Sequence, residues 1–249
     1  MTAGTIFDRT RTPLATWFAA IWFLTSQKNS MSALGLQRVL GFGSYETAWA
    51  WMHKLRRAMV RPERVKLSGI VELDETMIGG VTRGRAGYGD KVAVMIALEH
   101  NETRRLGRVR LAVADHPGTS QLVDFATTVI EPGSTIRTDG ARTLRRLADL
   151  GYRHEFTVGY SAPDKASVLP GVHLVASLLK RWLIGTLHFR VEEQHLPYYL
   201  DEYTFRFNRR SATSRRLLFY RLLEQAIPTD PHPLAQLHKP GETPISDFT

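Results

Sequence analysis

Two aspartates occupy positions at which paired carboxylates can do chemistry. Asp74 lies within the alternating, β-branched stretch 69–78, which predicts a strand, and Asp139 directly follows a second predicted strand over 134–138. If these strands are neighbours in one sheet, the two carboxylates face one another and repel, and divalent metal is the natural remedy. Two such ions can activate a water or a 3′-hydroxyl and stabilise the leaving oxygen of a phosphodiester, which is chemistry that breaks and joins DNA strands.

A third metal ligand is expected from the long helix predicted over 171–187, which contains no acid. His173, Ser177 and Lys180 stand at positions i, i+4 and i+7, and therefore on one face of that helix. A neutral imidazole of His173 can ligate a metal, and Lys180 can hold a phosphate of the substrate strand. Since imidazole is softer than carboxylate, we expect relatively greater activity with Mn²⁺ than in a Glu-bearing relative, and tolerance of His173→Glu.

Each of these residues also has an ordinary structural interpretation. Asp139 before Gly140 suits a turn or a helix cap, and His173 suits a polar stripe on a helix. Asp74 could be a surface acid at a strand end, although Asp is disfavoured inside strands. The pair of acids on adjacent strands is therefore the informative feature, rather than either acid alone.

The elements that would position these residues follow a recognisable order. Strands are predicted over 69–78, 91–100, 108–115, 134–138 and 154–158, and helices over 120–130, 141–150, 171–187 and 196–207. Three consecutive strands form an antiparallel meander, and the later strands arrive through helical crossovers. This order predicts an α/β fold with an RNase H-like mixed sheet and flanking helices.

A small all-α module precedes the predicted sheet. Helices are expected over 13–24, 32–40 and 45–60, and the tight turn 41–44 joins the last two in a helix-turn-helix pattern. The stretch 53–66 carries six basic residues and one acid, which favours DNA contacts by Lys54, Arg56, Arg57 and Arg61. The alternative is any three-helix bundle with a solvated charged face.

Composition narrows the class of protein. The 249 residues carry 33 Lys+Arg against 24 Asp+Glu, a net charge of +9, and residues 1–70 alone hold 10 basic and 3 acidic side chains. This excess favours a polyanionic partner, nucleic acid first. The chain has no Cys, which excludes a disulfide scaffold, a thiolate zinc site and a cysteine nucleophile. We expect a DNA-binding module over 1–66, a catalytic domain over 67–222 and a Pro-rich irregular tail over 223–249.

The most apolar stretch is 14–24, whose 11 residues fall short of the roughly 20 that a membrane-spanning helix needs. Asp8 ahead of it, and the lack of a small-residue cleavage site after it, argue against a signal peptide. We therefore expect a cytoplasmic, nucleoid-associated protein with no membrane partner.

Three segments together resemble one family: VELDETMIGG at 71–80, TDG at 138–140, and HLVASLLKRWLIGTLHF at 173–189 followed by HLPYYLDEYTFRFNRR at 195–210. The family is the bacterial insertion-sequence transposases of the DDE superfamily, in the ISXO-like branch with a zinc ribbon, a helix-turn-helix and an RNase H-like catalytic domain. The resemblance runs from about residue 3 to residue 222. The family's Cys-rich ribbon has no counterpart in this chain, so we expect no zinc and a truncated or lost ribbon.

The resemblance implies specific roles. Asp74 and Asp139 match the first and second catalytic aspartates, His173 the third position and Lys180 the lysine farther along that helix, with two Mg²⁺ ions (or Mn²⁺) bound by the first three. Tyr199, Arg206, Asn208, Arg209 and Arg210 fall in the closing motif, whose arginines are implied to contact DNA or to pack against the sheet. The implied partners are the terminal inverted repeats of the element and target DNA, bound by a homo-oligomer.

Three functions remain open on the sequence. The first is an active transposase that hydrolyses the 3′ ends of the element and joins them to target DNA. The second is a catalytically inactive, repressor-like DNA-binding protein derived from a transposase. A weaker third is a structure-specific nuclease that cuts without joining.

Overall fold

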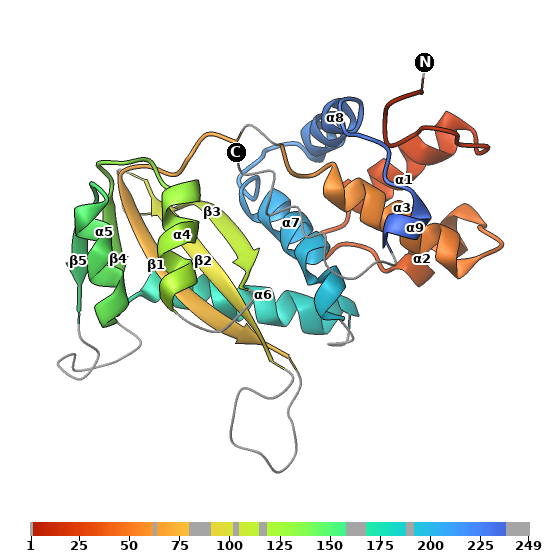
Figure 1. Cartoon of the computed structure of the whole chain (residues 1–249). Helices are drawn as coiled ribbons and strands as arrows, with labels where there is room; N and C mark the ends of the chain where they lie inside the picture. The colour runs from red at the N-terminus through yellow and green to blue at the C-terminus, as the bar shows by residue number, and fades with distance from the viewer. Residues whose placement is uncertain are drawn as a thin grey trace, which may run out of the picture. The chain divides into compact units, whose positions relative to one another are not determined.

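The computed structural model describes residues 2–61, 64–79, 91–101, 105–114, 119–157, 168–187 and 192–237 (Figure 1). The chain divides into two compact units, which we treat separately. The helical unit comprises Met1–Arg64 and Ile184–Asp247, and the sheet unit is formed by Val65–Leu183.

The sheet unit contains a mixed sheet of five strands. They are β1 (Ile70–Ile78), β2 (Val92–His100), β3 (Leu106–Val113), β4 (Thr135–Thr138) and β5 (Arg153–Phe156), in the order β3-β2-β1-β4-β5. β1, β2 and β3 pair antiparallel, whereas β4 pairs parallel with both β1 and β5. The parallel strands arrive through helices, as crossovers require. The predicted α/β class with an RNase H-like mixed sheet is confirmed.

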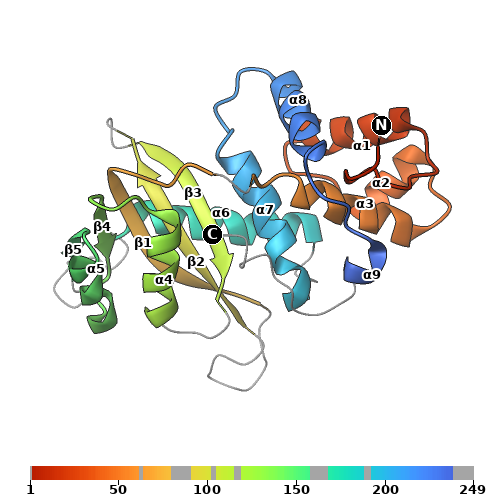
Figure 2. The same ribbon diagram turned by 45° about the horizontal axis from the view of Figure 1, so that its top comes forward.

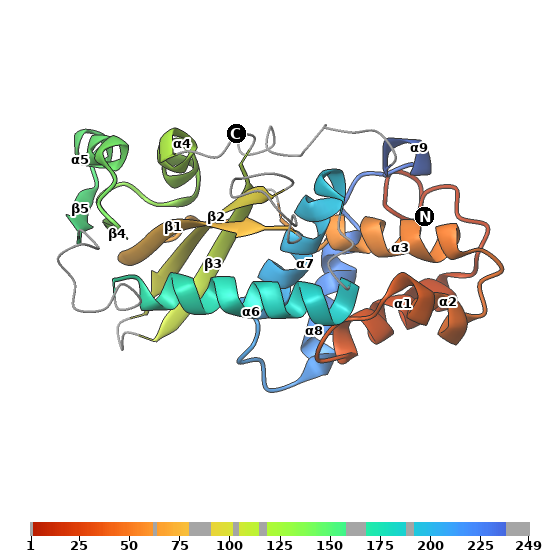
Figure 3. The same cartoon turned by 90° about the horizontal axis from the view of Figure 1, so that it is seen from below.

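Helices cover both faces of this sheet (Figure 3). On one face lie α4 (Thr119–Val129), the 3₁₀ helix η1 (Arg142–Arg145) and the short α5 (Arg146–Asp149), and on the other lies α6 (Pro170–Leu187). The predicted helix over 141–150 is thus a 3₁₀ turn followed by one α-turn. The core under α4 and α5 includes Val71, Leu73 and Ile136. Because side chains alternate along a strand, Glu72 and Asp74 point to the face that α6 covers.

The helical unit is built from α1 (Leu14–Ser26), α2 (Ala33–Leu40), α3 (Tyr45–Arg57), the 3₁₀ turn η3 (Glu193–His195), α7 (Leu196–Phe207), α8 (Arg215–Ala226) and α9 (Leu234–Leu237). Within it, α1 packs on α8, and α3 packs on α2 and α7 (Figure 2). Trp17 of α1 stacks on Trp51 of α3, with ring centroids 3.5 Å apart. The hydroxyls of Ser32 and Ser44 accept the capping hydrogen bonds at the starts of α2 and α3. The three predicted N-terminal helices are confirmed.

The two units divide the chain differently from the predicted domains. Residues 184–222 belong to the helical unit, whereas the sequence assigns them to the catalytic domain. The predicted boundary at 222 also cuts through α8, whose Leu222 and Ala226 are buried in the helical core. The Pro-rich tail over 223–249 therefore starts inside a helix and contains α9, and residues 238–249 lie outside the described part of the chain. None of the described helices is long and apolar enough to cross a membrane.

Candidate active site

The candidate active site lies where β1 and β4 run side by side. These strands are parallel, and their register pairs Val71 with Ile136 and Glu72 with Arg137. Two residues farther along each strand stand Asp74 and Asp139, so the same register carries the two aspartates to neighbouring positions on one face of the sheet. The Oδ1 atom of Asp74 accepts a hydrogen bond from the Glu75 N–H at 2.8 Å, and Oδ1 of Asp139 accepts one from the Ala141 N–H at 3.2 Å.

The helix α6 brings His173 to the first of these acids. The His173 Nε2 atom lies 3.5 Å from Oδ2 of Asp74, and the two side chains are 45% and 22% exposed. The imidazole therefore stands at the solvent boundary of the site, with the carboxylate deeper. The structure brings together two of the three residues that the sequence predicts as metal ligands, and the register of β1 and β4 carries the third alongside them.

Glu72 positions the start of this helix. Its Oε2 atom accepts a hydrogen bond from the Val172 N–H at 2.8 Å, and its Oε1 atom lies 2.9 Å from Nε2 of His100. Glu72 is buried, so it satisfies one of the free N–H groups in the first turn of α6 where water is excluded. Since His173 is the next residue, this hydrogen bond holds the imidazole beside Asp74.

A glycine allows the helix to approach this closely. A Cβ atom on Gly171 would lie 2.6 Å from Cδ2 of Leu98 and 2.9 Å from Oε2 of Glu72, both closer than real Cβ contacts. Only the absence of a side chain lets the first turn of α6 rest on β1 and β2 at this point. Sequence reasoning singled out neither Glu72 nor Gly171 as site-forming, although Glu72 shares the face of Asp74.

The electrostatics of the site follow from burial and like charge. Burial raises the pKa of Asp74 to about 6, and the negative charge of Asp139 contributes in the same direction. The Glu75 N–H and His173 act against this rise, because both favour the ionised carboxylate. The influence of Asp139 on Asp74 supports the proximity that the strand register indicates.

The other predicted residues of α6 lie farther from the acids. Ser177 is exposed and Lys180 half-buried. Lys180 stands seven residues beyond His173, which is about 10 Å along the helix axis. An amino group at that distance suits a phosphate next to the reacting one better than the reacting atoms themselves.

The donor set suits a divalent cation only in part. Two carboxylates and one imidazole are chemically appropriate ligands for Mg²⁺ or Mn²⁺. Among the described residues, however, no three His, Asp or Glu side chains are gathered closely enough to hold a metal ion. Asp139 is exposed, and a turn of its carboxylate toward Asp74 would complete the set but would break the hydrogen bond from the Ala141 N–H.

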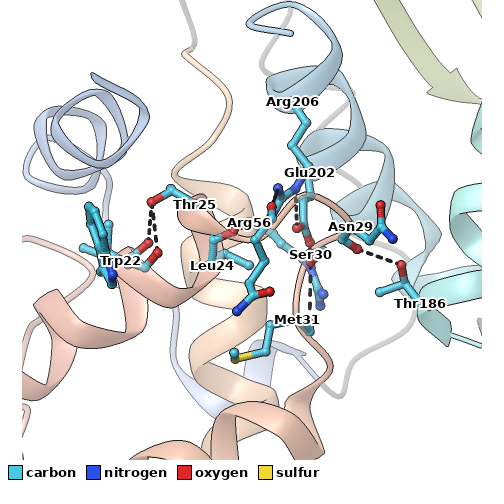
Figure 4. Close-up of polar contacts among 12 residues, drawn as sticks. Trp22, Leu24, Thr25, Asn29, Ser30, Met31, Arg56, Thr186, Glu202 and Arg206 are labelled. Carbon is cyan, nitrogen blue, oxygen red and sulfur yellow. Dashed lines mark hydrogen bonds and ion pairs between the residues drawn. The ribbon is translucent and has the colours of Figure 1, made fainter. Parts of the chain in front are cut away.

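Two of the arginines predicted to bind DNA belong to the helical core instead. Arg56 is 2% exposed, and its Nε donates to Oε2 of Glu202 at 2.9 Å (Figure 4). Nε of Arg206 donates to Oε1 of the same carboxylate at 2.8 Å. Arg206 also donates to the carbonyls of Leu24 and Gln27 at the end of α1. These guanidiniums serve the fold, so the expectation that Arg56 and Arg206 contact DNA is replaced by a structural role.

Glu202 is the centre of this network. It is completely buried, and burial alone would raise its pKa. The positive charges of Arg206 and Arg56, with a hydrogen bond from Ser30, hold the pKa of Glu202 below its usual value (Figure 4). The network joins α1, α3 and α7 of the helical unit.

The remaining predicted DNA contacts differ in exposure. The Arg209 guanidinium stacks over the Phe205 ring at 4.1 Å and donates to Gln225, and that of Arg210 lies over the Phe207 ring at 4.2 Å. Lys54 and Arg57 are half-buried on α3, and Arg61 is exposed. Of the predicted set, Arg61 and Arg210 are thus the most accessible to a DNA backbone.

Comparison with known proteins identifies the family of the chain. The model of the ISXO2-like transposase domain matches residues 66–208, more than half of the chain, and this range contains Asp74, Asp139, His173 and Lys180. No curated protein matches the chain. The carboxylate-bearing strands, the helix that crosses them and this match agree with one another. The chain belongs to the ISXO2-like transposase domain family of insertion-sequence transposases.

Proposed function

We propose that the protein is an active transposase, which cleaves DNA at the ends of an insertion sequence and joins the freed 3′-hydroxyls to target DNA. Asp74, Asp139 and His173 would hold divalent Mg²⁺ or Mn²⁺, two ions in the full site, and Lys180 would bind a substrate phosphate. The observation that carries the proposal is the distance of 3.5 Å between Nε2 of His173 and Oδ2 of Asp74. The register of β1 and β4 indicates that Asp139 lies on the same face of the sheet.

The residues of the chain have separable tasks in this account. When bound, a divalent cation supplies charge stabilisation at the phosphodiester and lowers the pKa of a water or hydroxyl. Asp74, partly buried, provides a fixed carboxylate, whereas exposed Asp139 can adjust when the substrate binds. The hydrogen bond between Glu72 and the Val172 N–H keeps His173 in place. Lys180 holds the DNA strand so that the reacting phosphate stays aligned.

DNA would be held by exposed and half-buried basic side chains of the helical unit. Arg61 and Arg210, with Lys54 and Arg57 of α3 and Arg209 of the closing motif, are the proposed contacts to phosphates. The module of α1, α2 and α3 would act as a helix-turn-helix that recognises the terminal inverted repeats. Joining two ends to one target would involve a homo-oligomer assembled on DNA in the cytoplasm.

A second candidate is a catalytically inactive, repressor-like DNA-binding protein. The observation that favours it is that no three candidate ligands are gathered for a metal among the described residues. The two functions separate in one experiment, in which labelled element ends are incubated with the protein and either Mg²⁺ or Mn²⁺. Cleavage and strand transfer support the transposase, whereas DNA binding without cleavage under either metal supports the repressor-like protein.

A further inference from the structure

The edge strand β5 ends in an exposed aromatic ring. Phe156, its last residue, is 46% exposed, and β5 lies at the edge of the sheet next to β4. Phe156 pairs in register with Thr138, the residue before Asp139. The ring therefore stands at the same end of the sheet as the candidate active site, on the face opposite to that of Asp74 and Asp139.

Three exposed arginines lie on the segment of η1 and α5, and α5 contacts β5. Arg142, Arg145 and Arg146 come from η1 and the start of α5, and residues 141–148 contain no acid. Arg142 and Arg145 are one turn apart in a 3₁₀ helix, so their side chains leave on the same side. Leu144 and Leu147 are buried and anchor the segment to the sheet. The result is a concentrated positive surface on a fixed backbone.

One of these arginines, Arg145, lies next to the ring. The Arg145 Cζ atom lies 5.7 Å from the centroid of the Phe156 ring, within reach of a cation–π interaction. The His154 ring also neighbours Phe156, with ring centroids 5.4 Å apart, and Nε2 of His154 is hydrogen-bonded to the Thr138 hydroxyl at 2.9 Å. Phe156 thus has one guanidinium and one imidazole as neighbours and is still 46% exposed.

Protection of the sheet edge explains only part of this arrangement. Charged residues commonly keep edge strands from pairing with other chains, and the ion pair of Arg137 with Glu155 at 2.8 Å serves that purpose. Those two side chains alternate with Thr138 and Phe156 and so point to the opposite face of the sheet. The three arginines of η1 and α5 and the exposed ring are left without such an explanation.

We propose that Arg142, Arg145, Arg146 and Phe156 form a DNA-binding surface, in which the arginines bind consecutive phosphates and the Phe156 ring stacks on one unpaired base. Aromatic rings beside a basic track are how proteins hold single-stranded DNA without sequence preference. The surface would hold the strand that continues from the reacting phosphodiester, where cleavage leaves unpaired nucleotides. This inference rests on the proposed function, because it takes DNA as the ligand.

The test uses the full chain and two probes of the same sequence, a blunt duplex and a duplex with a single-stranded 3′ tail. Fluorescence anisotropy measures the affinity for each probe over a range of salt. Phe156→Ala is expected to weaken binding of the tailed duplex by roughly 5- to 100-fold and to leave the blunt duplex unchanged. Phe156→Tyr keeps a stacking ring and is expected to bind the tailed duplex as the wild type does.

The arginines are tested against a matched control. Arg142→Ala is expected to weaken both probes and to lower the slope of log affinity against log salt by about 0.9, the loss of one phosphate contact. The control is Arg105→Ala, an exposed arginine of the same unit at the start of β3, near the opposite end of the sheet, with no expected effect. Thermal unfolding confirms that each variant is folded.

Two results would overturn the inference: equal effects of Arg142→Ala and Arg105→Ala, or an effect of Phe156→Ala that is absent or the same for both probes. In either case cleavage and strand transfer by the wild type would leave the proposed function standing. A wild-type chain that neither binds these probes nor cleaves element ends would instead remove the proposed function, and the DNA-binding surface with it.

Discussion

The Oε2 atom of Glu72 on β1 accepts the Val172 N–H at the start of α6 at 2.8 Å, across 100 residues of sequence. This hydrogen bond ties the helix that carries His173 to the strand that carries Asp74. The geometry of the candidate site therefore depends on a residue that is not among the candidate metal ligands.

Replacing Glu72 tests this dependence. Glu72→Ala leaves the Val172 N–H and the His100 ring without their buried acceptor, and we expect a loss of about 1–3 kcal/mol in the free energy of unfolding. Glu72→Gln keeps an acceptor oxygen and should recover most of the stability and the turnover rate. Urea denaturation and strand-transfer kinetics measure both effects. Glu72→Ala with wild-type stability and rate would show that α6 is positioned by other contacts.

Gly171 offers a second test, with a control on the same helix. Gly171→Ala places a methyl group against Leu98 and Glu72, so we expect destabilisation by about 1–3 kcal/mol. Gly185→Ala, where a Cβ meets no described atom within 4 Å, should be neutral or stabilise by about 0.5–1 kcal/mol. Thermal unfolding compares the pair. Equal effects at the two positions would mean that the close approach of α6 to the sheet at Gly171 does not affect stability.

The arginines of the helical unit should separate into two classes. Arg56→Ala removes one partner of the fully buried Glu202, and we expect it to cost about 3–5 kcal/mol of stability. Arg61→Ala should change the free energy of unfolding by no more than about 0.5 kcal/mol. It should weaken DNA binding and lower the slope of log affinity against log salt by about 0.9. Denaturation and DNA-binding titrations assign each residue. A stable Arg56→Ala variant with weak DNA binding would restore Arg56 as a DNA contact.

His53 should make stability depend on pH. It is fully buried, neither ring nitrogen has a hydrogen-bond partner among the described residues, and burial and then the positive charge of Arg56 lower its pKa. The unfolded chain binds a proton at His53 below about 6.5 and the folded chain does not, so stability is present above that pH and lost as the pH falls. His232, whose pKa burial lowers to about 4, acts in the same direction between 6.5 and 4.

The matched measurement compares the wild type with His53→Leu. Leucine is apolar and of similar size, so the variant should be at least as stable at neutral pH and should lose less stability between pH 6.5 and 4. Urea denaturation at several pH values gives both quantities. Parallel pH profiles for the two proteins would show that His53 does not resist protonation in the folded chain.

Much of the sheet could be predicted because its signals are local. The alternation around Asp74 and the turn at Gly133 mark β1 and the start of β4, and the order of elements determines their pairing. The roles of Glu72 and Arg56 could not be predicted, because their partners lie 100 and 146 residues away. In the sequence, Arg56 has the pattern of a solvent-exposed helix residue, and only the fold shows that it is buried against Glu202. In α8, arginines interleave with the apolar residues, so its pattern does not predict a helix that packs on the core through Leu222 and Ala226.

The paired aspartates carry the central claim, and strand transfer of labelled element ends with Mg²⁺ or Mn²⁺ tests it most directly. We predict that the wild type joins ends to target DNA, and that Asp74→Asn and Asp139→Asn each lower the rate at least about 100-fold while remaining folded. Asp124→Asn, an exposed acid on α4 in the same unit, should behave as the wild type. Wild-type rates in both Asp74→Asn and Asp139→Asn would contradict the account.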